Sequence, residues 1–146
     1  MHLVRAVAVG LAPVLLLSAG LGAGKPAEPE AVVVQHILVG FKSSVRGKTI
    51  DRTKAEASTL AQDLVVRARA GEDFDVLVRT YTDDSHPGIY KLTNTGAPRM
   101  SGARTRDQMV PGFGDLSFRL AVGEVGLVPY HGANSPYGWH VVKRLE

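Results

Sequence analysis

Nine consecutive residues, AVVVQHILV at positions 31–39, constrain the fold of this 146-residue chain more than any other segment. A short, nearly continuous apolar run rich in β-branched residues predicts a strand that is covered on both faces. Because side chains alternate along a strand, its two faces are expected to carry different sets. One face carries Val32, Val34, His36 and Leu38, and the other carries Val33, Gln35, Ile37 and Val39.

Two helices are predicted after a basic, aperiodic loop. The first runs from Thr53 to Ala70, because Thr53 and Glu56 form a T-x-x-E capping box and apolar residues recur with the spacing of one helix face. The second is expected over residues 74–81, which repeat the same apolar spacing. A covered strand followed by two helices predicts an α+β domain.

The C-terminal half is rich in glycine and proline, so few elements are expected there. A short strand is predicted at residues 89–93, a Pro-Gly turn within residues 108–114 and one helical turn at residues 115–120. Residues 125–130 and 137–145 predict two strands that pair antiparallel across the loop between them.

The first 24 residues have the build of a secretory signal peptide, with a cation near the start, an uncharged apolar run and small residues at the end. A transmembrane helix needs about 20 apolar residues, so no stable membrane span is expected, although an uncleaved signal would keep the chain attached. Residues 25–30, with two prolines, predict an extended linker before a domain at residues 31–146. We therefore expect an exported protein, periplasmic or secreted.

Composition excludes several classes of site. The chain has no cysteine, which removes disulfides, thiolate metal sites and thiol nucleophiles. Its 17 basic and 14 acidic residues are interspersed and give no case for nucleic-acid binding. The motifs of nucleotide-binding loops, zinc proteases and serine hydrolases do not occur in it. His86 and His131 have no ligand spacing with the other histidines, so no metal or cofactor is expected.

Several short motifs occur together in a familiar order. They are QHILV at 35–39, TKAEA at 53–57, AGEDF at 70–74, DDS at 83–85, QMVPGF at 108–113, VGEVG at 122–126 and GWHVV at 138–142. With them the chain resembles the parvulin-type peptidyl-prolyl cis-trans isomerases, or PpiC-like rotamase domains. The resemblance implies a parvulin-like α+β fold, with a four-stranded antiparallel sheet surrounded by about four helices. It also implies a cofactor-free monomer that acts on proline-containing unfolded or extended polypeptides.

The resemblance also assigns site residues. His36 and His140 match two family histidines that hydrogen-bond to each other under the active site, and Asp84 matches a position held by cysteine or aspartate. Met109 and Phe113 match walls of the pocket that binds proline.

Two tyrosines stand where this chain departs from the family pattern. Tyr90 takes the place of the third pocket wall, because Gly88-Ile89-Tyr90 replaces a Gly-Asp-Leu stretch and a longer loop follows. Tyr137 falls where some members carry serine. The basic loop matches the arginine-rich phosphate loop of phospho-specific members only irregularly, so phosphoserine-proline specificity is not expected.

The expected reaction is rotation about an Xaa-Pro bond, which crosses a barrier of about 20 kcal/mol set by amide resonance. A pocket that grips proline and strips water from the preceding carbonyl favours the twisted transition state without a nucleophile. Lowering the barrier by ~4 kcal/mol would accelerate rotation about a thousandfold. In this hypothesis the histidines and Asp84 fix the shape of the pocket, and the Asp84 carboxylate disfavours negative charge on the substrate carbonyl.

Plainer interpretations stay open at this point. His36, Met109 and Phe113 are also compatible with an ordinary core, and Asp84 with the cap of a turn. The main alternative function is an exported peptide-binding chaperone module with little or no turnover. A histidine-based hydrolase is a third interpretation, weakened because no nucleophile is placed beside the histidines.

Overall fold

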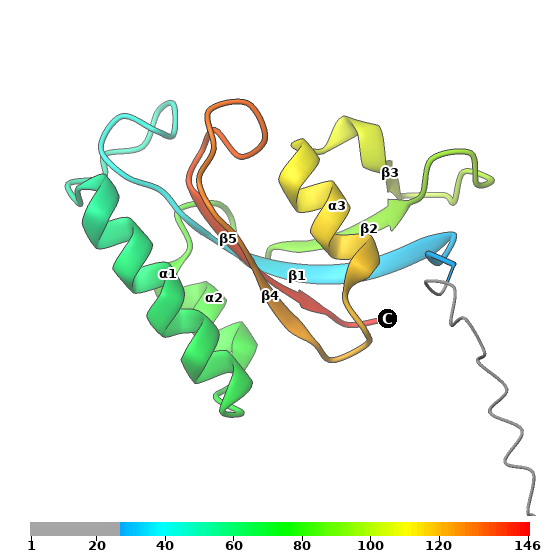
Figure 1. Ribbon diagram of the computed structural model, residues 1–146, viewed down its shortest axis with the longest axis horizontal. Helices are drawn as coiled ribbons and strands as arrows, with labels where there is room; N and C mark the ends of the chain where they lie inside the picture. The colour runs from blue at the N-terminus through cyan, green and yellow to red at the C-terminus, as the bar shows by residue number, and fades with distance from the viewer. Residues whose placement is uncertain (1–26) are drawn as a thin grey trace, which may run out of the picture.

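The computed structural model describes residues 27–146, so the expected signal peptide and the first two residues of the expected linker lie outside the described part. In Figure 1 a twisted sheet lies between two helical layers, with strands in the order β3-β2-β1-β5-β4. Within the described range, no helix has both the length and the apolar character needed to cross a bilayer.

Several elements occur where the sequence predicted them. The strands are β1 (Ala31–Val39), β2 (Ile89–Thr93), β3 (Arg104–Thr105), β4 (Val125–Val128) and β5 (Trp139–Arg144). The α-helices are α1 (Lys54–Arg69), α2 (Phe74–Tyr81) and α3 (Pro111–Arg119), and a 3₁₀ helix, η1 (Arg106–Gln108), precedes α3. Central β1 pairs antiparallel with both β2 and β5, and β4 pairs antiparallel with β5.

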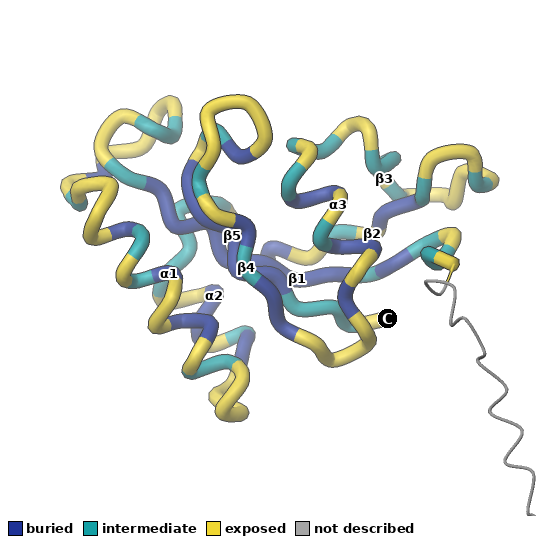
Figure 2. Tube along the Cα trace, viewed as in Figure 1, coloured by how far each residue is buried: buried dark blue, intermediate teal, exposed yellow. Residues whose placement is uncertain are grey.

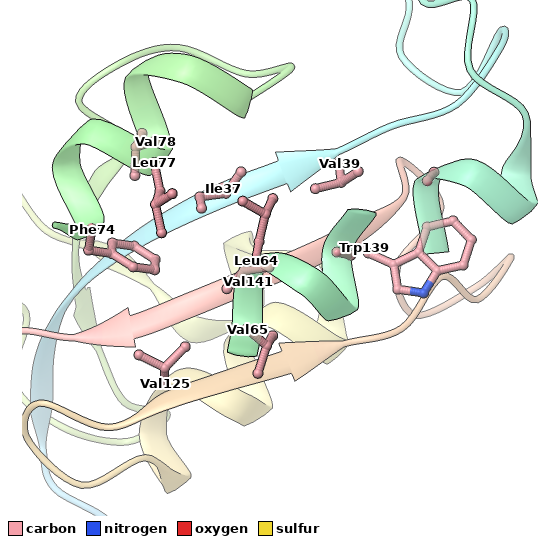
Figure 3. Packing of buried hydrophobic residues seen from close by; sticks show 12 residues of the cluster. Ile37, Val39, Leu64, Val65, Phe74, Leu77, Val78, Val125, Trp139 and Val141 are labelled. Carbon is pink, nitrogen blue, oxygen red and sulfur yellow. The ribbon is translucent and has the colours of Figure 1, made fainter. Parts of the chain in front are cut away.

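One face of the sheet packs against α1 and α2. The predicted capping box is present, since the Thr53 side chain accepts from the Glu56 amide and the Glu56 carboxylate accepts from the Thr53 amide. The helices bury Leu64 and Leu77 against Ile37 of β1 (Figure 3). The odd-numbered face of β1 is thus covered as its alternation predicted.

The other face packs against α3. Val32 and Val34 of β1 lie in a second buried cluster with Phe113 and Phe118 of the helix and Val142 of β5. Figure 2 shows the result, a sheet that is largely buried beneath helices whose outer surfaces are exposed. The prediction of a strand covered on both faces is confirmed.

The prediction of a four-stranded antiparallel sheet was wrong in the number of strands and in the direction of one of them. Residues 104–105 form a fifth strand that runs parallel to β2, so the sheet is mixed. The expected count of about four helices is met by three α-helices and a 3₁₀ helix among the described residues. A two-residue strand after a long loop has no periodicity that the sequence could display.

The expected Pro-Gly turn was also wrong, because Pro111 is the first residue of α3. Proline suits this position, since the amide that it lacks has no partner in the first turn of a helix. The helical turn expected at residues 115–120 is the second half of this longer helix.

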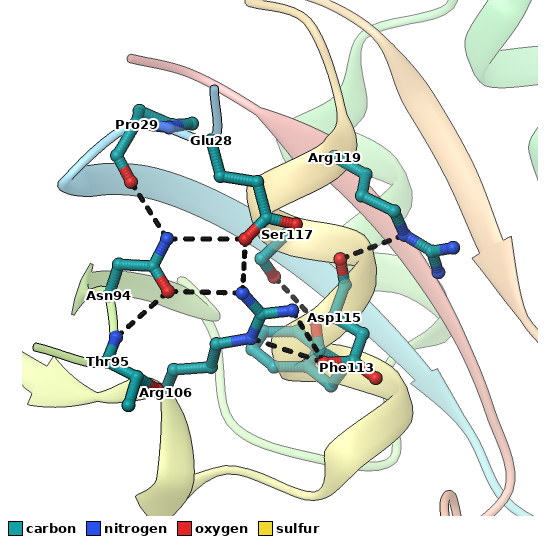
Figure 4. A network of polar contacts seen from close by, with 9 residues as sticks. All are labelled: Glu28, Pro29, Asn94, Thr95, Arg106, Phe113, Asp115, Ser117 and Arg119. Atoms are coloured by element: carbon teal, nitrogen blue, oxygen red, sulfur yellow. Dashed lines mark hydrogen bonds and ion pairs between the residues drawn. The ribbon is translucent and has the colours of Figure 1, made fainter. Parts of the chain in front are cut away.

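Arg106 ties the segment before β1 to α3 (Figure 4). Its guanidinium forms ion pairs with Glu28 and with Asp115, and donates to the side-chain oxygen of Asn94 at 3.1 Å. Asn94 in turn donates to the carbonyl oxygen of Pro29 at 3.0 Å. This network holds the segment that leads into Met109 and α3.

Candidate active site

A cavity of about 340 Å³ opens between the sheet and α3. It brings together every site residue singled out in the sequence, namely His36, Asp84, Tyr90, Met109, Phe113, Tyr137 and His140. These residues come from β1, the turn after α2, β2, the segment before α3 and its start, and the segment that leads into β5 together with β5 itself. The remaining lining residues are Leu38, Val45, Arg104, Gln108 and Val110.

The two histidines form the buried side of this cavity. Leu38 of β1 lies opposite His140 of β5, which places His36 diagonally across from His140 on the same sheet face. Their Nδ1 atoms are 3.3 Å apart, and each residue is only 4% exposed. The Nε2 atom of His36 lies 3.1 Å from Oδ2 of Asp84. The three side chains thus form a continuous polar chain, Asp84–His36–His140.

The environment of this polar chain sets the charges of Asp84 and His140. The hydrogen bond from His36 lowers the pKa of Asp84 to about 2, so its carboxylate is ionised at neutral pH. Burial disfavours the imidazolium form of His140 and lowers its pKa to about 3, so that ring is neutral. Because an ionised carboxylate can only accept, the Nε2 atom of His36 carries a proton and donates a hydrogen bond to Asp84. The geometry therefore fixes the orientation of the His36 ring between Asp84 and His140.

Aromatic rings form the apolar side of the cavity. Phe113 is 1% exposed, and its ring centre lies 5.1 Å from that of His36 and 5.7 Å from that of Tyr90, both in edge-to-face geometry. Tyr90 also donates its hydroxyl to Asp84 Oδ2 at 3.1 Å, while burial raises the pKa of this phenol. Met109 lies half-buried before α3, and Tyr137 is exposed at the rim.

Three lining residues escaped the sequence analysis. Val45 belongs to the basic, aperiodic loop, Arg104 belongs to a stretch with no periodic pattern, and Gln108 was noted only as part of the QMVPGF motif. By contrast, Leu38 shares the predicted face of His36. Among residues 27–146, no cluster of three or more histidine, aspartate or glutamate side chains has a geometry that would hold a metal ion.

Acidification below about pH 6.5 is expected to destabilise the fold through His140. A histidine in the unfolded chain takes up a proton near pH 6.5, whereas burial holds the pKa of folded His140 at about 3. The unfolded state therefore binds more protons in this window, and the free energy of unfolding falls by up to about 1.4 kcal/mol per pH unit as the pH drops. Urea unfolding between pH 7 and pH 5 measures this slope.

Two variants test the assignment of that slope to His140. His140→Phe should make the dependence shallower, because the buried titrating group is gone. His131→Gln, which changes an exposed loop histidine, should keep the wild-type slope. Equal slopes in all three proteins would contradict the assignment.

Two solved structures have a similar fold. The peptidyl-prolyl isomerase ESS1 from Candida albicans matches with a TM-score of 0.59 at 26% identity, over 80% of this chain and 63% of that one. The solution structure of TbPIN1 matches with the same TM-score of 0.59 at 22% identity, over 80% of this chain and 98% of that one. At that identity the second match supports the fold alone.

Two curated relatives carry the name chaperone SurA. The protein from Albidiferax ferrireducens is 42% identical over 86 residues, 59% of this chain and 17% of the relative. The protein from Pseudomonas fluorescens is 33% identical over 124 residues, 85% of this chain and 25% of the relative. The chain thus spans at most a quarter of the length of these two proteins. The family model described as the PPIC-type PPIASE domain matches residues 22–146. The chain therefore belongs to the PPIC-type peptidyl-prolyl isomerase domain family, as its ordered motifs predicted.

Proposed function

We propose that the chain is a peptidyl-prolyl cis-trans isomerase that acts on Xaa-Pro bonds of exported proteins. One observation carries the proposal: the apolar residues Met109 and Phe113 line the same cavity as the polar chain Asp84–His36–His140. An apolar pocket for a prolyl ring thereby lies next to a fixed carboxylate.

The proposed mechanism is non-covalent. Met109 and Phe113 grip the prolyl ring, and the buried walls remove water from the carbonyl that precedes it. Planar amide resonance places negative charge on this carbonyl, and the twisted transition state loses that charge. A site that does not solvate this charge favours the twisted form. The ionised Asp84 supports this role, because its negative charge opposes charge on the oxygen.

Met109, Phe113, Tyr90 and Tyr137 are proposed as substrate-binding residues. His36, Asp84 and His140 are proposed to keep the shape and polarity of the pocket. Each histidine is held through a hydrogen bond of the polar chain, and Asp84 also accepts from the Tyr90 hydroxyl. No cofactor enters this mechanism, and the proposed substrate is a proline-containing unfolded or extended polypeptide.

The proposed setting is outside the cytoplasm, periplasmic or secreted. Residues 1–24 would direct export, and residues 25–30 would link this signal peptide to the domain. Residues 31–146 would form the monomeric isomerase domain. The composition of the first 24 residues supports export.

A chaperone module with little turnover is the second candidate. Two observations favour it: the curated relatives are named chaperones, and a long loop separates β2 from β3. Both candidates place the polypeptide in the same cavity, so they differ in turnover rather than in location.

Proline-limited refolding of a denatured client protein distinguishes the two functions. An isomerase present well below the client concentration should accelerate the slow prolyl phase, whereas a chaperone should leave its rate unchanged or retard it. His36→Leu should reduce the acceleration, and His131→Leu, in an exposed loop outside the cavity, should retain it. An unaccelerated slow phase with the wild-type chain would reject the isomerase proposal.

A further inference from the structure

Arg104 gives the cavity a positive charge that the proposed mechanism does not use. Of the described residues that line the cavity, it alone carries a permanent cation. The neighbouring acid, Asp84, already accepts hydrogen bonds from His36 and Tyr90.

The register of the sheet places Arg104 on the face that carries the cavity. Arg104 of β3 pairs with Leu92 of β2, which pairs with Val32 of β1. Leu92 and Val32 belong to the cluster packed on α3, so Arg104 lies on the sheet face that carries the cavity. The side chain thus lines the cavity because of strand pairing, not because of the position of a mobile loop.

Tyr90 supports the guanidinium of Arg104. The central guanidinium carbon lies 5.6 Å from the centre of the Tyr90 ring. A guanidinium over an aromatic face is held by cation–π attraction, and it loses less freedom when it then binds a ligand. Tyr90 therefore connects the cation to the proposed proline pocket.

The exposed side chain of Arg104 has no hydrogen bond or ion pair with any described residue, unlike that of Arg106 two positions later. Arg106 is bound by Glu28 and Asp115 and serves the fold. An arginine that rests on a pocket wall with its donors unused is suited to a planar anion, because its donor fork matches a carboxylate with two parallel hydrogen bonds.

We infer that Arg104 is a specificity-determining residue that binds a carboxylate of the substrate, so that the cavity prefers glutamate or aspartate next to the prolyl residue. The inference rests on the proposed isomerase function and names its substrate class. A partly exposed ion pair of this kind corresponds to a difference of about threefold to fivefold between the catalysed exchange rates of an acidic peptide and its neutral counterpart.

Short peptides that differ in one flanking residue test the preference. Exchange between cis and trans forms is measured by NMR for peptides with Glu, Gln or phosphoserine before proline, and with Glu or Gln after it. In one of the two pairs, with the variable residue either before or after proline, the Glu peptide should exchange about threefold to fivefold faster than the Gln peptide at low peptide concentration. The difference should lie in KM, and added salt should diminish it.

Three arginine variants isolate the role of Arg104, and two of them remove the same single positive charge from different places. In Arg104→Gln the Glu-to-Gln ratio should fall to about one, and Arg104→Lys should recover only part of it because an ammonium lacks the planar fork. Arg99→Gln removes the same charge from an exposed site in the neighbouring loop, outside the cavity lining, and should keep the wild-type ratio.

The outcomes separate this inference from the proposed function. If every peptide is accelerated but Glu and Gln do not differ, the inference is overturned and the isomerase function stands. A preference restricted to phosphoserine, or one that survives in Arg104→Gln, also overturns it. If no peptide is accelerated at all, the proposed function itself fails.

Discussion

Replacing Met109 by alanine is expected to slow catalysed exchange of an Xaa-Pro peptide by about tenfold. Met109 forms one wall of the cavity and is only half-buried in the free protein, so the truncation removes contact area for the prolyl ring more than it removes core packing. Burying a methionine side chain fully contributes roughly 2 kcal/mol, and each 1.4 kcal/mol corresponds to about a factor of ten in rate. NMR exchange measurements on a peptide of fixed sequence give the rate.

The chain offers a matched control for this prediction. Met100 is 51% exposed and does not line the proposed site, so Met100→Ala makes the same chemical change away from the cavity. Its exchange rate should equal that of the wild type. An unchanged rate in Met109→Ala would contradict the pocket assignment of Met109.

Replacing Gly138 by alanine is expected to destabilise the domain by about 3 kcal/mol or more. Gly138 has a φ of +142°, and a Cβ atom there would lie 2.2 Å from the carbonyl oxygen of Val39. That oxygen belongs to the backbone of the central strand and cannot rotate away, so β1 and β5 would have to separate. The midpoint of urea unfolding measures the loss of stability.

Gly132→Ala serves as the control for Gly138. A Cβ atom at Gly132 meets nothing within 4 Å, and this glycine lies in the exposed loop before β5. The variant should unfold within about 0.5 kcal/mol of the wild type, as surface substitutions usually do. Similar midpoints for the two variants would show that the close approach at Gly138 does not constrain the fold.

The elements best predicted from the sequence are those whose side chains repeat with a fixed period. The alternation in residues 31–39 predicted a strand covered on two different faces, and the structure covers one face with α1 and α2 and the other with α3. The Thr53 capping box located the start of α1. Short-range chemistry determined these features, so it could be read directly from the chain.

Other features depend on contacts between distant segments. The two-residue strand β3 exists because a long loop brings Arg104 back beside Leu92. No local sequence pattern predicts this pairing. For the same reason the places of Arg104 and Val45 in the cavity were not predicted. Periodicity alone indicated an apolar strand with one histidine, and the family resemblance supplied its partners His140 and Asp84. The structure brings all three side chains into hydrogen-bonding distance.

Exchange spectroscopy on a short peptide with one Ala-Pro bond tests the central claim most directly. With a catalytic amount of the wild-type chain, the rate of interconversion between the cis and trans signals should rise in proportion to the protein concentration. The peptide should also shift the NMR signals of the Met109 methyl group and the Phe113 ring. Interconversion that stays at the unaided rate, over tens of seconds or longer, would contradict the account even if the peptide binds.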